Sequence, residues 1–366
     1  KALVIIQFTI SSCLIISALI ITQQLSYIQK KDMGYERNHI LTFRLKDWAI
    51  LDKIPVLKEE LQNLPEVLNV SVSSNLPNNI SSSTYVMWPG KPEDVTWMIY
   101  TGEVDQDFVE LFEIDIIRGR SFSIETGDKN GMVLINETAA RALPWEDPLG
   151  SELANWRDTC TIVGIMKDFH QHSLHQEIMP LQLFLNEQRS TVSVKVSGYD
   201  LKHTISEIGR IKESFSDKYP FTYSFFDDEF DKAYKIERKT EKMAEFFTLI
   251  TIIIACLGLY GLATFTAEQR VKEVGIRKVM GATIYQLVYM LSKDFTIPVF
   301  FSFLISVPIA NYLMKNWLDG FAYHINIGLF HFLATLVIMI LIAWITISFR
   351  TFRVASINPV DSLRHE

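Results

Sequence analysis

Four long apolar runs divide the chain into membrane-sized segments and one large polar segment. A helix needs about 20 residues to cross a hydrocarbon core of about 30 Å. The runs therefore predict transmembrane helices at residues 1–23, 244–265, 286–313 and 328–349. The polar segment between the first two runs is long enough to form an independent globular domain.

Mixed charges at helical spacing flank the polar segment. They predict one stalk helix at residues 24–39, with Gly34 suited to its C-terminal cap, and a second at residues 227–243. Such a stalk is either a rigid mechanical link between the membrane and the domain or a pair of solvated helix extensions. The pattern leaves both interpretations open.

Alternating apolar residues predict the fold of the domain at residues 40–226. Two stretches each show a strand, a helix and a strand, at residues 39–45, 54–64, 67–74, 190–198, 201–219 and 221–227. Two such units predict a ferredoxin-like porter lobe, in which two helices cover one face of a four-stranded sheet. The β-rich segment between them, about residues 76–188, is predicted to be an inserted lobe. The fold class is thus an α+β membrane protein.

Basic residues near the apolar runs predict the orientation of the chain. The segment 267–283, between the second and third runs, contains Arg270, Lys272, Arg277 and Lys278. Lys and Arg beside membrane spans are retained on the cytoplasmic side. Both termini and the tail at 350–366 are therefore expected in the cytoplasm, and the large domain is expected outside.

The charge distribution agrees with this orientation. Lys30 to Lys242 contains 25 basic and 35 acidic residues, a net charge of −10, whereas the remainder has a net charge of +3. The acidic balance outside the membrane indicates either cationic ligands or ordinary solubility. The hydrophobic content of 48% is high for a soluble protein.

The first apolar run is predicted to be a retained span, because no small-residue cleavage site precedes Gln23 and Gln24. Cys160 is the single cysteine of the polar domain, so no disulfide is predicted within it. The first residue is Lys1 and not Met, which suggests an excerpt from a longer polypeptide.

Three histidines, His170, His172 and His175, are candidate metal ligands. If residues 170–172 form a strand, His170 and His172 share a face, and His175 from the following turn would complete a three-ligand zinc site. The chain has no His-Glu-x-x-His pair and no nearby Cys ligand or general base. A polar strand and turn with surface histidines is therefore favoured, and no metal or cofactor is predicted.

The sequence contains no Gly-x-x-x-x-Gly-Lys-Ser/Thr loop, so the chain is not predicted to be an ATPase. If ATP drives it, a separate subunit must hydrolyse the ATP and bind a cytoplasmic surface. The segment 267–283 has apolar residues at helical spacing among its charges, which favours an amphipathic coupling helix. The alternative is a solvated basic loop.

Several motifs resemble the MacB/FtsX-like ABC transporter permeases. These are KEVGIRKVMGA from Lys272, INPVDSLRHE at the end of the chain, and one large domain between the first two of four spans. The runs DFVELFEIDIIRGRS from Asp107, VLINETAARAL from Val133 and IVGIMKDFHQHSLHQEIMPLQLFL from Ile162 resemble that family's periplasmic core domain. The chain is particularly similar to the C-terminal half of the doubled permeases of Bacteroidota.

The resemblance implies the permease subunit of an efflux or mechanotransmission transporter in the bacterial inner membrane. The implied partners are a cytoplasmic ABC ATPase dimer, a second permease half or an identical copy, the lipid bilayer and a periplasmic adaptor, with no nucleic acid. The implied ATPase-binding residues are Arg270, Glu273, Gly275, Ile276, Arg277, Lys278, Met280 and Gly281. The alternative function is a membrane-anchored sensor or scaffold that regulates a periplasmic or cell-wall partner.

Overall fold

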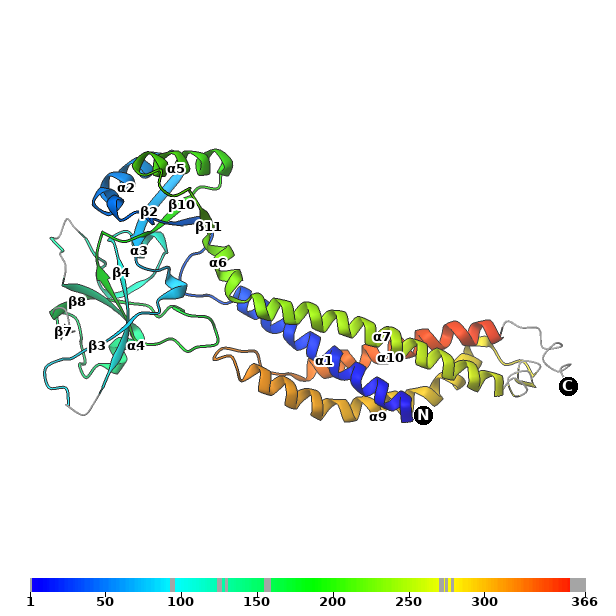
Figure 1. Ribbon diagram of the computed structural model, residues 1–366. Coiled ribbons are helices and arrows are strands. Elements are labelled where there is room, and N and C mark those ends of the chain that lie inside the picture. The colour runs from blue at the N-terminus through cyan, green and yellow to red at the C-terminus, as the bar shows by residue number, and fades with distance from the viewer. Residues whose placement is uncertain are drawn as a thin grey trace. The chain divides into compact units, whose positions relative to one another are not determined.

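A computed structural model describes the fold of the chain and shows two compact units (Figure 1). The membrane unit comprises Lys1–Lys30 and Ile236–Glu366, and the α+β unit comprises Lys31–Lys235. The structure describes residues 2–92, 96–123, 127–128, 131–154, 159–269, 273, 276–277 and 280–355.

Long apolar helices make up the described part of the membrane unit. They are α1 (Ala2–Lys30), α7 (Lys235–Gln269), α9 (Ile284–Leu318) and α10 (Leu329–Ala355). Among the described residues, four segments are long and apolar enough to cross a membrane: Ala2–Lys30, Lys235–Thr266, Phe295–Leu318 and Leu329–Ser348. The four predicted spans are thereby confirmed as helices of membrane-spanning length.

Side chains from all four helices share a buried cluster. Phe8 of α1, Leu259 of α7, Val299 of α9 and Ala343 of α10 belong to it. Helix α1 also packs along α9, where the Thr9 hydroxyl donates a hydrogen bond to the Ser302 carbonyl at 3.3 Å. These contacts pack the four helices into one bundle.

The helix ends differ from the predicted stalks. Helix α1 ends at Lys30, so the remainder of the stalk predicted at residues 24–39 is not helical. The chain turns there because Gly34 has a φ of +80° and donates its N–H to the Asp32 carboxylate at 2.9 Å.

The second predicted stalk, at residues 227–243, is divided into two helices. Helix α6 (Phe226–Ala233) ends at Tyr234, and α7 begins at Lys235. The Tyr234 side chain is buried, and its hydroxyl accepts a hydrogen bond from the Leu174 N–H at 2.8 Å. This anchoring of Tyr234 within the α+β unit accounts for the interruption.

The ferredoxin-like layer predicted for the α+β unit is present. Its strands are β1 (Ile40–Arg44), β2 (Val67–Ser73), β10 (Thr191–Val196) and β11 (Tyr223–Phe225), in the antiparallel order β11-β1-β10-β2. Helices α2 (Ile54–Gln62) and α5 (Leu201–Phe215) lie together against this layer (Figure 1). They cover a core that includes Phe43, Val70, Val72, Val194 and Ile208.

The inserted segment extends this layer into one 11-stranded sheet. Strand β4 (Met98–Val104) joins β2 where Val104 pairs with Ser73, and the order continues β4-β9-β6-β8-β5. The remaining strands and short helices are η1 (Trp48–Lys53), η2 (Pro77–Asn79), β3 (Ser83–Tyr85), α3 (Phe108–Leu111), β5 (Ile116–Gly119), β6 (Met132–Asn136), α4 (Glu137–Ala142), β7 (Glu152–Ala154), β8 (Thr159–Met166) and β9 (Leu181–Leu185). A second core, which includes Val86, Ile99, Ile135 and Ile162, supports this part of the sheet.

The face of the four-stranded layer opposite α2 and α5 is polar. Because side chains alternate along a strand, Thr42 and Arg44 point away from the core that holds Leu41 and Phe43. Thr42 is in register with Ser224 on one side and with Ser193 on the other, and Ser193 is in register with Ser71. A row of hydroxyl side chains therefore crosses this face, and α6 lies against β1 beside it.

Candidate functional site

The candidate coupling segment lies between the end of α7 at Gln269 and the start of α9 at Ile284. Five of its eight predicted ATPase-binding residues are described by the structure: Glu273, Ile276, Arg277, Met280 and Gly281. The other three, Arg270, Gly275 and Lys278, lie outside the described residues.

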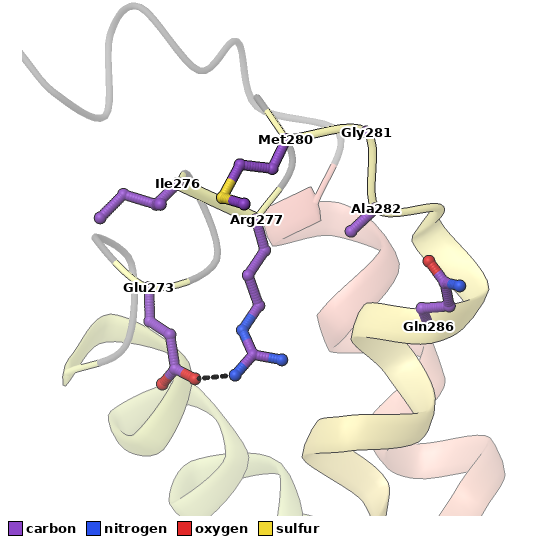
Figure 2. A pocket seen from close by; sticks show the side chains of 7 residues that line it. All are labelled: Glu273, Ile276, Arg277, Met280, Gly281, Ala282 and Gln286. Atoms are coloured by element: carbon purple, nitrogen blue, oxygen red, sulfur yellow. Dashed lines mark ion pairs between the residues drawn. The ribbon is translucent and has the colours of Figure 1, made fainter.

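The five described residues line one hollow, together with Ala282 and Gln286 (Figure 2). Its volume is about 830 Å³. Two apolar side chains are exposed here, Ile276 at 53% and Met280 at 82%. Exposed apolar side chains with charged neighbours are the kind of surface that another protein covers.

An ion pair connects two residues of this surface. The Arg277 Nη2 lies 2.9 Å from the Glu273 Oε1, and the two residues are four positions apart (Figure 2). An exposed pair at this spacing stabilises a helix by about 0.3–0.5 kcal/mol. It therefore contributes little to the stability of the segment, and the Arg277 guanidinium stays accessible to a partner.

A tight corner joins this surface to α9. The Ala282 N–H donates to the Arg277 carbonyl at 2.9 Å, and Gly281 has a φ of +91°. These are the features of a Schellman C-cap, in which a left-handed residue, usually Gly, ends the helix.

Helix α9 begins immediately after this cap. The Gln286 N–H donates to the Thr283 hydroxyl at 3.4 Å, and the Thr283 N–H donates to the Gln286 side-chain oxygen at 3.0 Å, which completes a capping box. The end of one helix and the start of the next are thus fixed by hydrogen bonds within a few residues.

Sequence reasoning missed part of this site. Ala282, Thr283 and Gln286 were not among the predicted site residues. The Thr-x-x-Gln spacing at the start of an apolar run is a known signature of a helix N-terminus and is visible in the sequence.

The three candidate metal ligands lie in a loop that follows β8. The strand predicted for His170 and His172 is wrong, because β8 ends at Met166 and the loop crosses to Met33, whose carbonyl accepts the His170 N–H at 2.9 Å. His170 is buried and not a surface histidine, whereas His175 is exposed. Within the described ranges, no group of three His, Cys, Asp or Glu side chains is placed to hold a metal ion.

Burial also changes the acidity of two of these histidines. It lowers the pKa of His170 to about 4, and Lys31 contributes in the same direction against Asp32 and Asp168. Burial also lowers the pKa of His172, whose ring meets Tyr100 edge to face at 4.9 Å. Both rings are therefore neutral at pH 7, which fits packing inside the domain.

Comparison with known proteins assigns family models to most of the chain. Residues 4–211 match the model of the MacB-like periplasmic core domain, and residues 245–359 match the model of the FtsX-like permease C-terminal region. No curated protein sequence matches the chain significantly.

Two solved structures are similar to the α+β part of the chain. The periplasmic region of MacB from Actinobacillus actinomycetemcomitans is 14% identical, with a TM-score of 0.41, and the match covers 56% of this chain and 96% of that one. The extracellular domain of the noncanonic ABC-type transporter YknZ from Gram-positive bacteria is also 14% identical, with a TM-score of 0.35, covering 55% of this chain and 92% of that one.

Proposed function

Because the chain belongs to the MacB/FtsX-like family of ABC transporter permeases, we propose that it couples ATP hydrolysis by a separate cytoplasmic ATPase to movement of its periplasmic α+β unit. As a permease of this family, it is the membrane subunit of an ABC transporter in the inner membrane. The 366 residues contain no P-loop, and we propose that a partner subunit supplies the ATPase.

The observation that carries the proposal is the exposed apolar surface at Ile276 and Met280 beside a fixed corner. A partner that covers this surface would move Glu273 and Arg277 and, through the Gly281 cap, the start of α9. The residues proposed to bind the ATPase are Arg270, Glu273, Gly275, Ile276, Arg277, Lys278, Met280 and Gly281.

The contacts inside the bundle support transmission beyond α9. Helix α9 packs along α1 and α10. Helix α1 leads by its own chain into the α+β unit at residue 31, and α7 follows directly from that unit at residue 235. A displaced α9 would therefore reach the α+β unit by its packing on α1 and along the chain through α7, and no tunnel through the bundle is needed.

The proposed orientation places both termini and residues 267–283 in the cytoplasm. It rests on the basic residues Arg277, Arg350 and Arg353 near the span ends. Single-cysteine labelling of intact cells with an impermeant maleimide tests it, on a background in which Cys13, Cys160 and Cys256 are replaced by Ser. A cysteine at Tyr199, exposed in the α+β unit, should be labelled, and one at Met280 should be labelled only after lysis.

The test of coupling is purification of the full-length protein from bacterial membranes, with mass spectrometry of its partners and an ATPase assay. We expect recovery of a P-loop subunit, and its loss in the Arg277→Glu variant. The matched control is Arg210→Glu, which reverses an exposed arginine on α5 of the α+β unit and should leave recovery unchanged.

A second variant separates docking from helix stability. Glu273→Arg combined with Arg277→Glu retains an ion pair at the same spacing but exchanges the two charges on the surface. If docking depends on the surface, the exchanged variant should also fail to recover the ATPase. An intact membrane protein that never recovers an ATPase would overturn the proposal in favour of a sensor or scaffold.

A further inference from the structure

A hollow of about 780 Å³ lies within the α+β unit, on the polar face of the four-stranded layer. Thr42 and Arg44 of β1 and Ser224 of β11 form its floor, the loop after β2 forms one wall with Asn75 and Asn78, and α6 contributes Lys232. Its volume is in the range that encloses small ligands, which is about 300–1,000 Å³.

The charge inside this hollow is positive. Lys232 is paired with Glu229 of the same helix at 2.6 Å, so these two side chains cancel. The Arg44 side chain forms no ion pair or hydrogen bond with any described residue, and it is exposed to solvent at the hollow. A guanidinium in this state binds a carboxylate or a phosphate through two parallel hydrogen bonds.

The other lining groups suit a ligand rich in hydroxyls. The side-chain amides of Asn75 and Asn78 have no hydrogen-bond partner in the described part of the chain, and both are only half-buried. Each amide both donates and accepts hydrogen bonds, as a sugar hydroxyl does. Most of the lining side chains are polar, so an apolar ligand would leave many of these groups without partners.

We propose that this hollow binds an acidic saccharide, with Arg44 holding its anionic substituent and the Asn75 and Asn78 amides binding its ring hydroxyls. The proposal concerns the α+β unit alone and does not depend on the ATPase. A carboxylated and a phosphorylated sugar share the required chemistry.

The site has a structural consequence because one wall is α6. A ligand that contacts both β1 and Lys232 ties α6 to the sheet, and α6 is followed, after Tyr234, by the membrane helix α7. A ligand bound in the hollow should therefore reduce local unfolding of α6, the helix that precedes the membrane helix α7.

The experiment measures binding to the full chain in lipid nanodiscs by isothermal titration calorimetry, with glucuronate, glucose 6-phosphate, glucose and inorganic phosphate as probes. We expect at least one anionic sugar to bind, and glucose and inorganic phosphate each to bind at least tenfold more weakly. The preferred anionic sugar then identifies the carboxylate or the phosphate as the natural substituent. Failure of both anionic sugars to bind at millimolar concentration, or equal binding of inorganic phosphate, would overturn the proposal.

Variants locate the site. Arg44→Gln should weaken binding of the anionic sugar at least tenfold, whereas Arg210→Gln, on the opposite side of the layer, should not change it. The double variant Asn75→Ala, Asn78→Ala should weaken binding of the anionic sugar but leave the weak binding of inorganic phosphate unchanged. Hydrogen exchange in the wild type should slow over residues 226–233 when the sugar is added. Equal sugar affinity of Arg44→Gln and the wild type would place the ligand elsewhere and refute the assignment.

Discussion

Lys58 of α2 forms an ion pair with Asp105, whose side chain is only 1% exposed. Asp105 follows β4, so the pair joins the helix layer of the ferredoxin-like part to the inserted part of the sheet. The same carboxylate accepts hydrogen bonds from the Ser71 hydroxyl at 2.6 Å and from the Val72 N–H at 2.9 Å. Asp107, at 2.5 Å from the Lys58 ammonium, adds a second carboxylate to the cluster.

Replacing Lys58 with Met should destabilise the α+β unit by about 3–5 kcal/mol, because the Asp105 carboxylate would remain buried without its cation. Hydrogen exchange of β2 and β4 in the full-length protein measures the effect. The exposed Lys53→Met is the control and should change the free energy of unfolding by less than about 0.5 kcal/mol.

The combination of Lys58→Met with Asp105→Asn tests the reason for that loss. Asn carries no charge and keeps one oxygen that can accept the Val72 N–H, while its NH2 group can donate to the Ser71 hydroxyl, so the double variant should be more stable than Lys58→Met alone. A double variant as unstable as the single one would show that packing of the Lys58 side chain, and not its charge, holds the two parts together.

Gly281→Ala should weaken the corner between the coupling segment and α9. The φ of +91° is strained for a residue with a Cβ, at a cost of about 1–2 kcal/mol, whereas Asn tolerates this region better. The expected order of partner-stimulated ATPase activity is wild type, then Gly281→Asn, then Gly281→Ala. Equal activity of all three proteins would mean that coupling does not depend on the Gly281 cap.

Gly258 and Gly261 offer a matched pair within α7. A Cβ on Gly258 would lie 2.5 Å from the Gln7 side-chain oxygen of α1, whereas a Cβ on Gly261 meets nothing within 4 Å. Gly258→Leu should therefore displace the Gln7 side chain and weaken the α1–α7 contact, whereas Gly261→Leu should not. The midpoint temperature of thermal unfolding in detergent measures the effect of each variant. An equal fall in this midpoint for the two variants would contradict the proposed difference between the two positions.

The His170 ring should make the α+β unit less stable in acid. Its folded pKa of about 4 lies below the ordinary 6.5, so the unfolded chain binds more protons between these values. The free energy of unfolding should be fully retained above pH 6.5 and should fall as the pH decreases towards 4.

Replacement of the ring tests this dependence. In His170→Gln, the free energy of unfolding should depend less on pH between 6.5 and 4, as measured by hydrogen exchange of β8. Replacement of the exposed His203 by Gln should leave this pH dependence unchanged. An unaltered profile in His170→Gln would assign the acid sensitivity to other groups.

Local patterns were sufficient to predict much of this fold. Apolar runs of membrane-spanning length can be recognised without knowing what they pack against. The apolar residues of β1, β2 and β10 likewise alternate with polar ones every two residues. The stalk boundaries were less accurate, because α1 ends where Gly34 turns and α6 ends where Tyr234 is held by Leu174. The latter contact joins residues far apart in the sequence and leaves no periodic signal.

The sequence by itself determined the spans, the ferredoxin-like layer, the absence of a P-loop and the segment that we propose as the coupling surface. These properties depend on composition and short-range spacing. Only the tertiary structure brought Lys58 to Asp105, placed Arg44 beside Asn75 and α6, and buried His170. Such neighbours are decided by strand order and register, as when Thr42 pairs with both Ser193 and Ser224, and no local pattern encodes which distant strands will pair.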